Sequence, residues 1–197
     1  MFKIIASFTI SLILVTWSSG SALADTKNYF PPGALAPSST DSDSFMNAWF
    51  SEHLAAMSEP VLKPINGVRT YRFTWLRTFH HPVAVRIVAT DTHVKLFATE
   101  LDGAGGYDPG KVLRKIERDL TVDQSRKFDD LIQRSGFWSL PSHEKTSGLD
   151  GSKWILEGVT DKYHVVVRWM PESGPVREIG EQFLSLAGWR FGSKEFY

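Results

Sequence analysis

Hydrophobic residues recur every three or four positions in three stretches of the chain, and this spacing predicts three amphipathic helices. Asp41 or Asp43 can cap the first helix, because a short acidic side chain accepts hydrogen bonds from the free amides of a first turn. Thr121 and Gln124 form a capping box at the start of the second helix. The predicted helices cover residues 45–57, 121–135 and 176–187.

Other stretches alternate hydrophobic and polar residues with a period of two, which predicts strands. In residues 68–79 the odd positions hold Tyr71, Phe73 and Trp75, and this pattern predicts a strand with one buried face. Residues 111–120 fit a helix or an edge strand, and a strand is favoured because a new helix starts directly after them. The other predicted strands cover residues 83–88, 94–98, 152–160 and 163–170.

Together these elements predict one α+β domain over residues 45–187. We expect a largely antiparallel sheet of five or six strands, with about three helices packed on one face. The chain contains no cysteine, which excludes disulfides, thiolate metal sites and a cysteine nucleophile. The fold must therefore be held by its hydrophobic core alone.

Residues 1–24 have the anatomy of a secretory signal peptide. Lys3 supplies the positive start, residues 4–17 are uncharged and apolar, and Ala22-Leu23-Ala24 is a cleavage pattern that places the cut before Asp25. We therefore predict an exported protein, periplasmic or secreted. The alternative is an uncleaved anchor, but the apolar stretch is short for a span of about 20 residues. No later segment is apolar enough to cross a bilayer, so no membrane insertion is expected after cleavage.

The segments on either side of the predicted domain have a different character. Residues 25–44 are polar and rich in proline and serine, which predicts a flexible, extended leader. Residues 188–197 are aromatic, and we expect them to form a C-terminal tail, either docked or frayed.

Charge and composition narrow the classes of function. The chain carries 22 basic and 22 acidic side chains with no long block of one sign, which argues against nucleic-acid binding. Seven Trp, 13 Phe and five Tyr are a heavy aromatic load, which can fill a core or line a ligand groove. The glycine-rich residues 102–110 lack the spacing of a nucleotide-binding fingerprint, so a surface loop is favoured over a binding lip.

One polar cluster follows from the predicted hairpin of residues 152–170. If Asp161-Lys162 is a two-residue turn, Glu157 and Arg168 are diagonal neighbours on one face and His164 lies close by. Asp150 enters from the preceding loop. Two interpretations remain open. The first is a cross-strand ion pair on a solvated sheet face. The second is a polar site in which Asp150, Glu157 and His164 act as acid and base and Arg168 holds an anionic ligand.

The sequence predicts neither a metal site nor a cofactor. His80-His81 would need a third ligand from elsewhere, and His143-Glu144 lacks the second histidine of the zinc-protease pattern. The chain also lacks a phosphate-binding loop and the signature of an activated nucleophile.

A resemblance extends over roughly residues 105–187. Phe137-Trp138-Ser139-Leu140-Pro141, then Gly148-Leu149-Asp150-Gly151 with Trp154, and then Tyr163-His164-Val165-Val166 with Arg168-Trp169 are similar to a group of exported bacterial proteins. That group is a domain of unknown function with no established activity, so it implies no site residues. It does imply a bacterial origin and therefore a periplasmic or secreted location.

Two function classes follow. The first is a non-catalytic envelope protein that binds another envelope protein or a small ligand, through the polar sheet face or the loop at residues 102–110. The second is a small hydrolase-like enzyme built on Asp150, Glu157 and His164. The first is preferred, because structural ion pairs outnumber functional ones.

Overall fold

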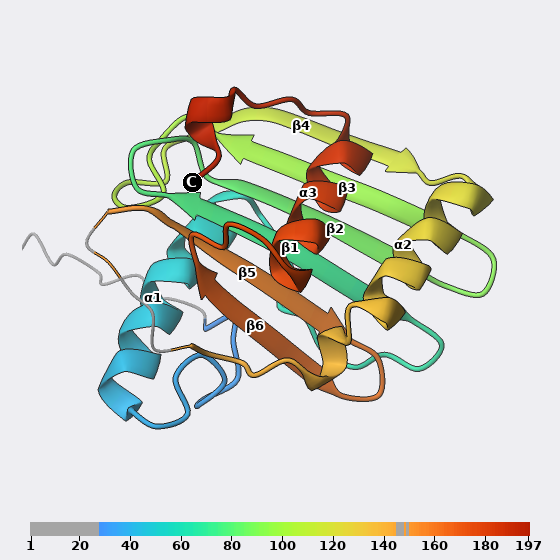
Figure 1. The fold of residues 1–197 in the computed structure, drawn as a ribbon, viewed down its shortest axis with the longest axis horizontal. Coiled ribbons are helices and arrows are strands. Elements are labelled where there is room, and N and C mark those ends of the chain that lie inside the picture. The colour runs from blue at the N-terminus through green and yellow to red at the C-terminus, as the bar shows by residue number, and fades with distance from the viewer. Residues whose placement is uncertain (1–27, 145–147, 149) are drawn as a thin grey trace, which may run out of the picture.

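The computed structural model describes residues 28–144, 148 and 150–197, so the predicted signal peptide and the first residues of the predicted leader lie outside it. In this part of the chain one antiparallel sheet of six strands is combined with three α-helices (Figure 1). The helices are α1 (Thr40–Ala56), α2 (Val122–Arg134) and α3 (Pro175–Ala187). The strands are β1 (Arg69–Arg77), β2 (Val83–Ala89), β3 (Val94–Leu101), β4 (Val112–Asp119), β5 (Ser152–Val159) and β6 (Tyr163–Trp169).

The strand order is β4-β3-β2-β1-β5-β6, and every neighbouring pair is antiparallel. The first four strands form a meander, and the chain then crosses the sheet through α2 so that the β5–β6 hairpin pairs with β1. This arrangement confirms the predicted α+β class and the antiparallel sheet. It also places β2 and β1 at the centre of the sheet, with β5 as the inner strand on the other side of β1.

The helices cover both faces of the sheet, so the expectation of helices on one face was wrong. Figure 1 shows α2 and α3 in front of the sheet and α1 behind it. The even-numbered side chains of β1 show the consequence: Arg72 and Thr74 are 0% exposed and Leu76 is 1% exposed. The sequence pattern also predicted that the polar face of β1 would be exposed to solvent. This prediction was wrong, because α1 covers that face.

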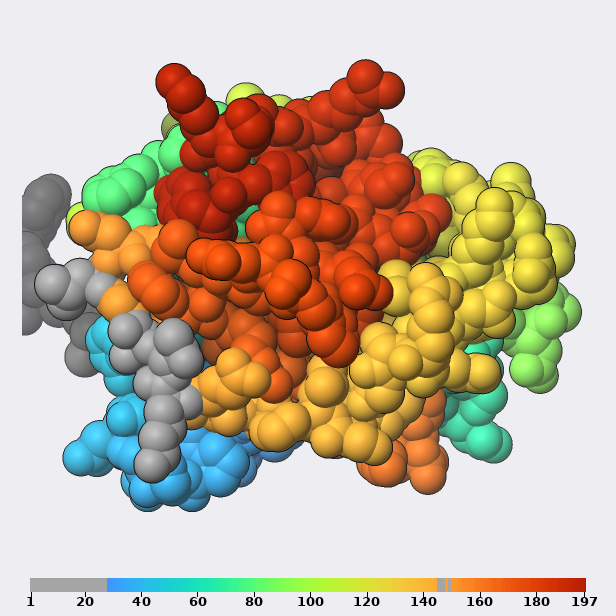
Figure 2. Space-filling model, in the orientation of Figure 1, coloured from blue at the N-terminus to red at the C-terminus, as the bar shows by residue number. Residues whose placement is uncertain are grey.

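The larger core lies between the sheet and the helices α2 and α3. The ring centroids of Phe73 and Trp154 are 5.2 Å apart, and those of Phe128 and Phe183 are 5.0 Å apart. Gly180 lets α3 approach closely, since a Cβ at this position would lie 2.4 Å from the Trp154 ring. Figure 2 shows α3, α2 and the C-terminal segment over this face of the sheet, which leaves no exposed polar sheet face there.

The described part of the predicted leader is packed rather than extended. Tyr29, Phe30 and Leu35 are buried against α1 and the sheet and form part of the second core. Helix α1 begins at Thr40, five residues before the predicted start, and its N-cap is Ser39. Asp43 is not the cap, because its carboxylate accepts hydrogen bonds from the amides of Gly33, Leu35 and Ala36 instead. Sequence composition suggested a tether because the few apolar residues stand among prolines and serines.

The C-terminal tail is docked. Phe191 and Phe196 pack on Trp75, at centroid distances of 5.3 and 5.0 Å. Glu195 forms an ion pair with the buried Arg77 at 2.9 Å. Residues 189–197 therefore belong to the folded body.

The β5–β6 hairpin has a different register from the predicted one. Val159 pairs with Tyr163, so the connection has three residues rather than two, and Trp154 lies opposite Arg168 instead of Trp169. A shift of one residue moves each β6 side chain to the other face relative to β5. The predicted strand at residues 111–120 and the capping box of Thr121 are both confirmed.

Candidate ligand-binding pocket

Glu157, the centre of the predicted polar cluster, is buried on the face of the sheet that α1 covers. It forms a bidentate ion pair with Arg72, at 2.7 Å from Nε and 2.8 Å from Nη2. The Tyr163 hydroxyl donates to Glu157 Oε1, the oxygen that also accepts from Arg72 Nη2, at 3.0 Å. Burial and the neighbouring Glu157 carboxylate raise the pKa of Tyr163 well above its usual value. Glu157 is therefore fully engaged inside the fold.

The Arg72–Glu157 pair belongs to a larger buried network. Arg72 also donates to the carbonyl oxygen of Pro60 at 2.8 Å, and Glu59 accepts from Arg86 at 2.8 Å. Two cations and two carboxylates thus compensate one another. Buried charges require such pairing, so this network serves the structure.

The other predicted site residues lie elsewhere. The His164 ring packs on Phe137, with centroids 5.1 Å apart, on the face of the sheet opposite Glu157. Arg168 pairs with Glu144 at 2.9 Å. Asp150 is exposed in the loop before β5. The predicted site of Asp150, Glu157 and His164 with Arg168 as anion holder is therefore not assembled, and neither is the predicted Glu157–Arg168 ion pair. The register shift is the physical reason.

The two adjacent histidines also separate. His80 Nδ1 lies 2.7 Å from the Tyr197 hydroxyl, whereas His81 Nδ1 lies 3.5 Å from the Glu100 carboxylate. Within residues 28–144, 148 and 150–197, no group of three or more His, Asp or Glu side chains is arranged to hold a metal ion.

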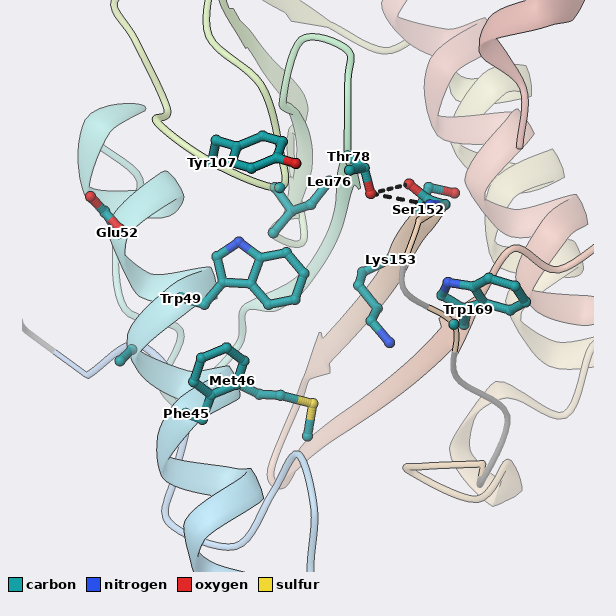
Figure 3. A pocket seen from close by; sticks show the side chains of 14 residues that line it. Phe45, Met46, Trp49, Glu52, Leu76, Thr78, Tyr107, Ser152, Lys153 and Trp169 are labelled. Carbon is teal, nitrogen blue, oxygen red and sulfur yellow. Dashed lines mark hydrogen bonds between the residues drawn. The ribbon is translucent and has the colours of Figure 1, made fainter.

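A pocket of about 1020 Å³ lies between α1, the loop at residues 102–110 and the adjoining ends of β1, β5 and β6. Its walls are mainly aromatic and aliphatic. Phe45 and Tyr107 line it while remaining 68% and 63% exposed. The large apolar side chains that line the pocket are Phe45, Met46, Trp49, Leu76, Tyr107 and Trp169 (Figure 3).

Lys153 is the cation of this pocket. The strand register places it between Leu76 on β1 and Trp169 on β6, in one row across the sheet. Figure 3 shows its side chain in the space between Trp49 and Trp169. In the part of the chain that the structure describes, Lys153 has no hydrogen-bond or ion-pair partner, and burial lowers the pKa of its amine. An apolar wall thus holds one uncompensated amine.

The other polar groups of the pocket are engaged or distant. Thr78 Oγ1 donates to the Gly151 carbonyl oxygen at 2.9 Å, and Ser152 donates to the main-chain oxygen of Tyr197. Glu52 lies on α1, and Figure 3 shows it at the far side of the pocket from Lys153. Lys153 is therefore the polar group best placed to meet a ligand.

The sequence contained a weak signal for this site. On β5, Lys153 shares a face with Ile155, Glu157 and Val159, which are all buried, so it is the single cation on that face of the strand. The loop at residues 102–110 contributes Gly106 and Tyr107, which fits the binding lip that was the less favoured interpretation. No pattern in the sequence could show that α1 would face these two segments.

Comparisons with protein-family models, with curated proteins and with solved structures each find no match to the chain. None of the helices in the described residues combines the length and the apolarity that a membrane span requires. Function therefore has to be inferred from the chemistry of the pocket itself.

Proposed function

We propose that this protein is a non-catalytic binding protein of the bacterial cell envelope, periplasmic or secreted, which takes a small and largely apolar ligand into the pocket beside α1. The observation that carries the proposal is the pocket itself. Ligand sites are concave, mostly apolar and fitted with a few polar groups that orient the ligand. This pocket has aromatic walls, a volume of about 1020 Å³ and one amine.

The positions of the charged side chains favour binding over catalysis. The carboxylate and imidazole groups of the hydrolase-like alternative lie on different faces of the sheet or in an exposed loop, so they cannot share one substrate. Glu52 and Lys153 are the charged side chains among the described residues that line the pocket. Figure 3 shows the two apart, without the contact between base and nucleophile that an activated site requires.

The proposed location is supported by the signal-peptide pattern of residues 1–24 and by the resemblance of residues 105–187 to exported bacterial proteins. Expression of the full chain in a bacterium, followed by intact-mass measurement of the periplasmic fraction, tests it. We expect a chain that begins at Asp25. A full-length chain in the cytosol would contradict the location.

Binding can be tested with N-phenyl-1-naphthylamine, a neutral probe whose emission rises in an apolar environment, and the chain from Asp25 onwards. We expect saturable binding to one site. Ala48 lines the pocket and is exposed, so Ala48→Phe fills space in the pocket without disturbing the core. This variant should weaken binding at least about tenfold, equivalent to about 1.4 kcal/mol.

The matched control is Ala55→Phe, which adds the same ring to an exposed position of α1 that does not line the pocket. This variant should bind the probe as the unmodified protein does. The proposed function is wrong if no saturable binding is seen, or if both variants bind equally well.

A further inference from the structure

The pocket contains a charge for which the protein provides no partner. Lys153 lies between two apolar neighbours on the sheet and has no carboxylate within ion-pair distance among the described residues. The folded protein bears the desolvation of this amine without a compensating contact. All four members of the Arg72 network, by contrast, are paired. An unpaired charge beside an apolar cavity indicates that its partner comes from outside.

We propose that the ligand is an amphipathic monocarboxylate, whose carboxylate pairs with Lys153 and whose hydrocarbon part lies against the aromatic wall of α1 and the loop at residues 102–110. This inference rests on the proposed function and adds the chemical class of the ligand. The charge of the ligand complements that of Lys153, and its apolar part covers Phe45 and Tyr107, the two exposed rings of the pocket.

A single negative charge fits the pocket better than two. The hydroxyls of Thr78 and Ser152 already donate to main-chain oxygens and are not free to bind further ligand oxygens. Glu52 is the other charged side chain among the described lining residues and repels anions. A phosphate monoester would therefore leave one charge uncompensated in an apolar site, which is unfavourable. A carboxylate needs only the one amine.

The aromatic wall fits the other end of such a molecule. Phe45 and Trp49 lie one turn apart on α1 with ring centroids 6.2 Å apart, and Trp169 faces them from β6 (Figure 3). Aromatic side chains of this size bury a large apolar area when a ligand covers them. Lys153 lies between the two walls, so a ligand held by its carboxylate would place its chain against both.

The experiment compares three ligands of equal chain length by isothermal titration, each below its aggregation concentration: decanoate, decanol and decyl phosphate. The chain from Asp25 onwards should bind decanoate at least tenfold more tightly than the other two. Lys153→Met keeps the length of the side chain and removes the charge. This variant should lose at least tenfold in affinity for decanoate and keep its affinity for decanol.

Two controls accompany these measurements. Lys63→Met removes an exposed lysine outside the pocket and should leave all three affinities unchanged. Lys153→Arg retains the charge and should retain the preference for decanoate. If Lys153→Met does not fold, the comparison of the three ligands on the unmodified protein still decides the question.

The outcomes separate the two proposals. If decanol or decyl phosphate binds as tightly as decanoate, the monocarboxylate inference is overturned. The inference is also overturned if none of the three ligands binds while the neutral probe still binds and Ala48→Phe weakens that binding. In both cases the proposed binding function stands. If neither these ligands nor the neutral probe bind, the proposed function itself fails.

Discussion

Asp43 illustrates how a single buried residue can organise a whole segment. Its carboxylate accepts hydrogen bonds from the amides of Gly33, Leu35 and Ala36, at 2.8, 2.9 and 3.0 Å. Burial by itself raises the pKa of a carboxyl, but the three amides outweigh it and lower the pKa of Asp43 below its usual value. A depressed folded pKa means that Asp43 stabilises the fold at neutral pH and loses this effect as the pH falls through that pKa.

Replacement of Asp43 by Ala should lower the free energy of unfolding by about 2–4 kcal/mol at pH 7, because three amides, two of them buried, lose a charged acceptor. Urea unfolding of the variant and the unmodified protein measures this difference. The difference should shrink as the pH falls below the folded pKa of Asp43. Asp41→Ala, at an exposed position of the same helix, should have little effect. Equal effects of the two variants on the free energy of unfolding would contradict the proposed role of Asp43 in holding residues 33–36.

At the scale of elements, the neighbouring inner strands β1 and β5 determine where charges can lie. Direct pairing of Arg72 with Glu157 across these strands brings their side chains together on the face under α1. Both side chains are 0% exposed, and their ion pair is therefore shielded from solvent. The same pairing places Leu76 beside Lys153 four residue pairs further along, at the pocket.

Glu157→Gln should destabilise the protein by roughly 3–5 kcal/mol, because it leaves Arg72 as an uncompensated buried charge. A catalytic role would instead have predicted loss of activity at unchanged stability. Glu117→Gln is the matched control, since Glu117 is exposed and pairs with Lys95 at the other side of the sheet. Chemical denaturation measures both, and a change below about 1 kcal/mol for Glu157→Gln would be evidence against a structural pair.

For the whole molecule, the segments at the two ends of the described chain complete the two cores. Residues 28–39 close the core under α1, and residues 189–197 close the edge of the larger core around Trp75. The buried Arg77 side chain has two of its partners in residues 189–197. Glu195 forms an ion pair with it, and the Phe191 ring lies 4.8 Å from its guanidinium carbon. The fold therefore extends beyond the predicted domain of residues 45–187.

Deletion of residues 189–197 should lower the free energy of unfolding by on the order of 4 kcal/mol or more, since it removes the packed rings of Trp189, Phe191 and Phe196 and an ion-pair partner of a buried arginine. The midpoint of urea unfolding measures the loss. Lys194→Ala changes only an exposed side chain of the same segment and should have almost no effect. A deletion variant as stable as the full chain would show that the tail is not part of the cooperative fold.

Most elements could be predicted because their signals are local. The alternation in β1, the capping box at Thr121 and the glycine that ends α3 each depend on neighbouring residues alone. The register of the hairpin could not be predicted in this way. Either register preserves the alternation within each strand, and only the packing of α1 on one face and α3 on the other distinguishes them.

The candidate site also combines features that the sequence predicts locally with features that depend on tertiary packing. By itself the sequence determined the α+β class, the largely antiparallel sheet and the order of the strands along the chain. Tertiary structure alone decided that α1 covers the second face of the sheet, that Glu157 is buried against Arg72, and that Lys153 faces an aromatic wall. Helices and strands are set by contacts a few residues apart, whereas a pocket is made by segments distant in sequence, whose meeting depends on the packing of the whole chain.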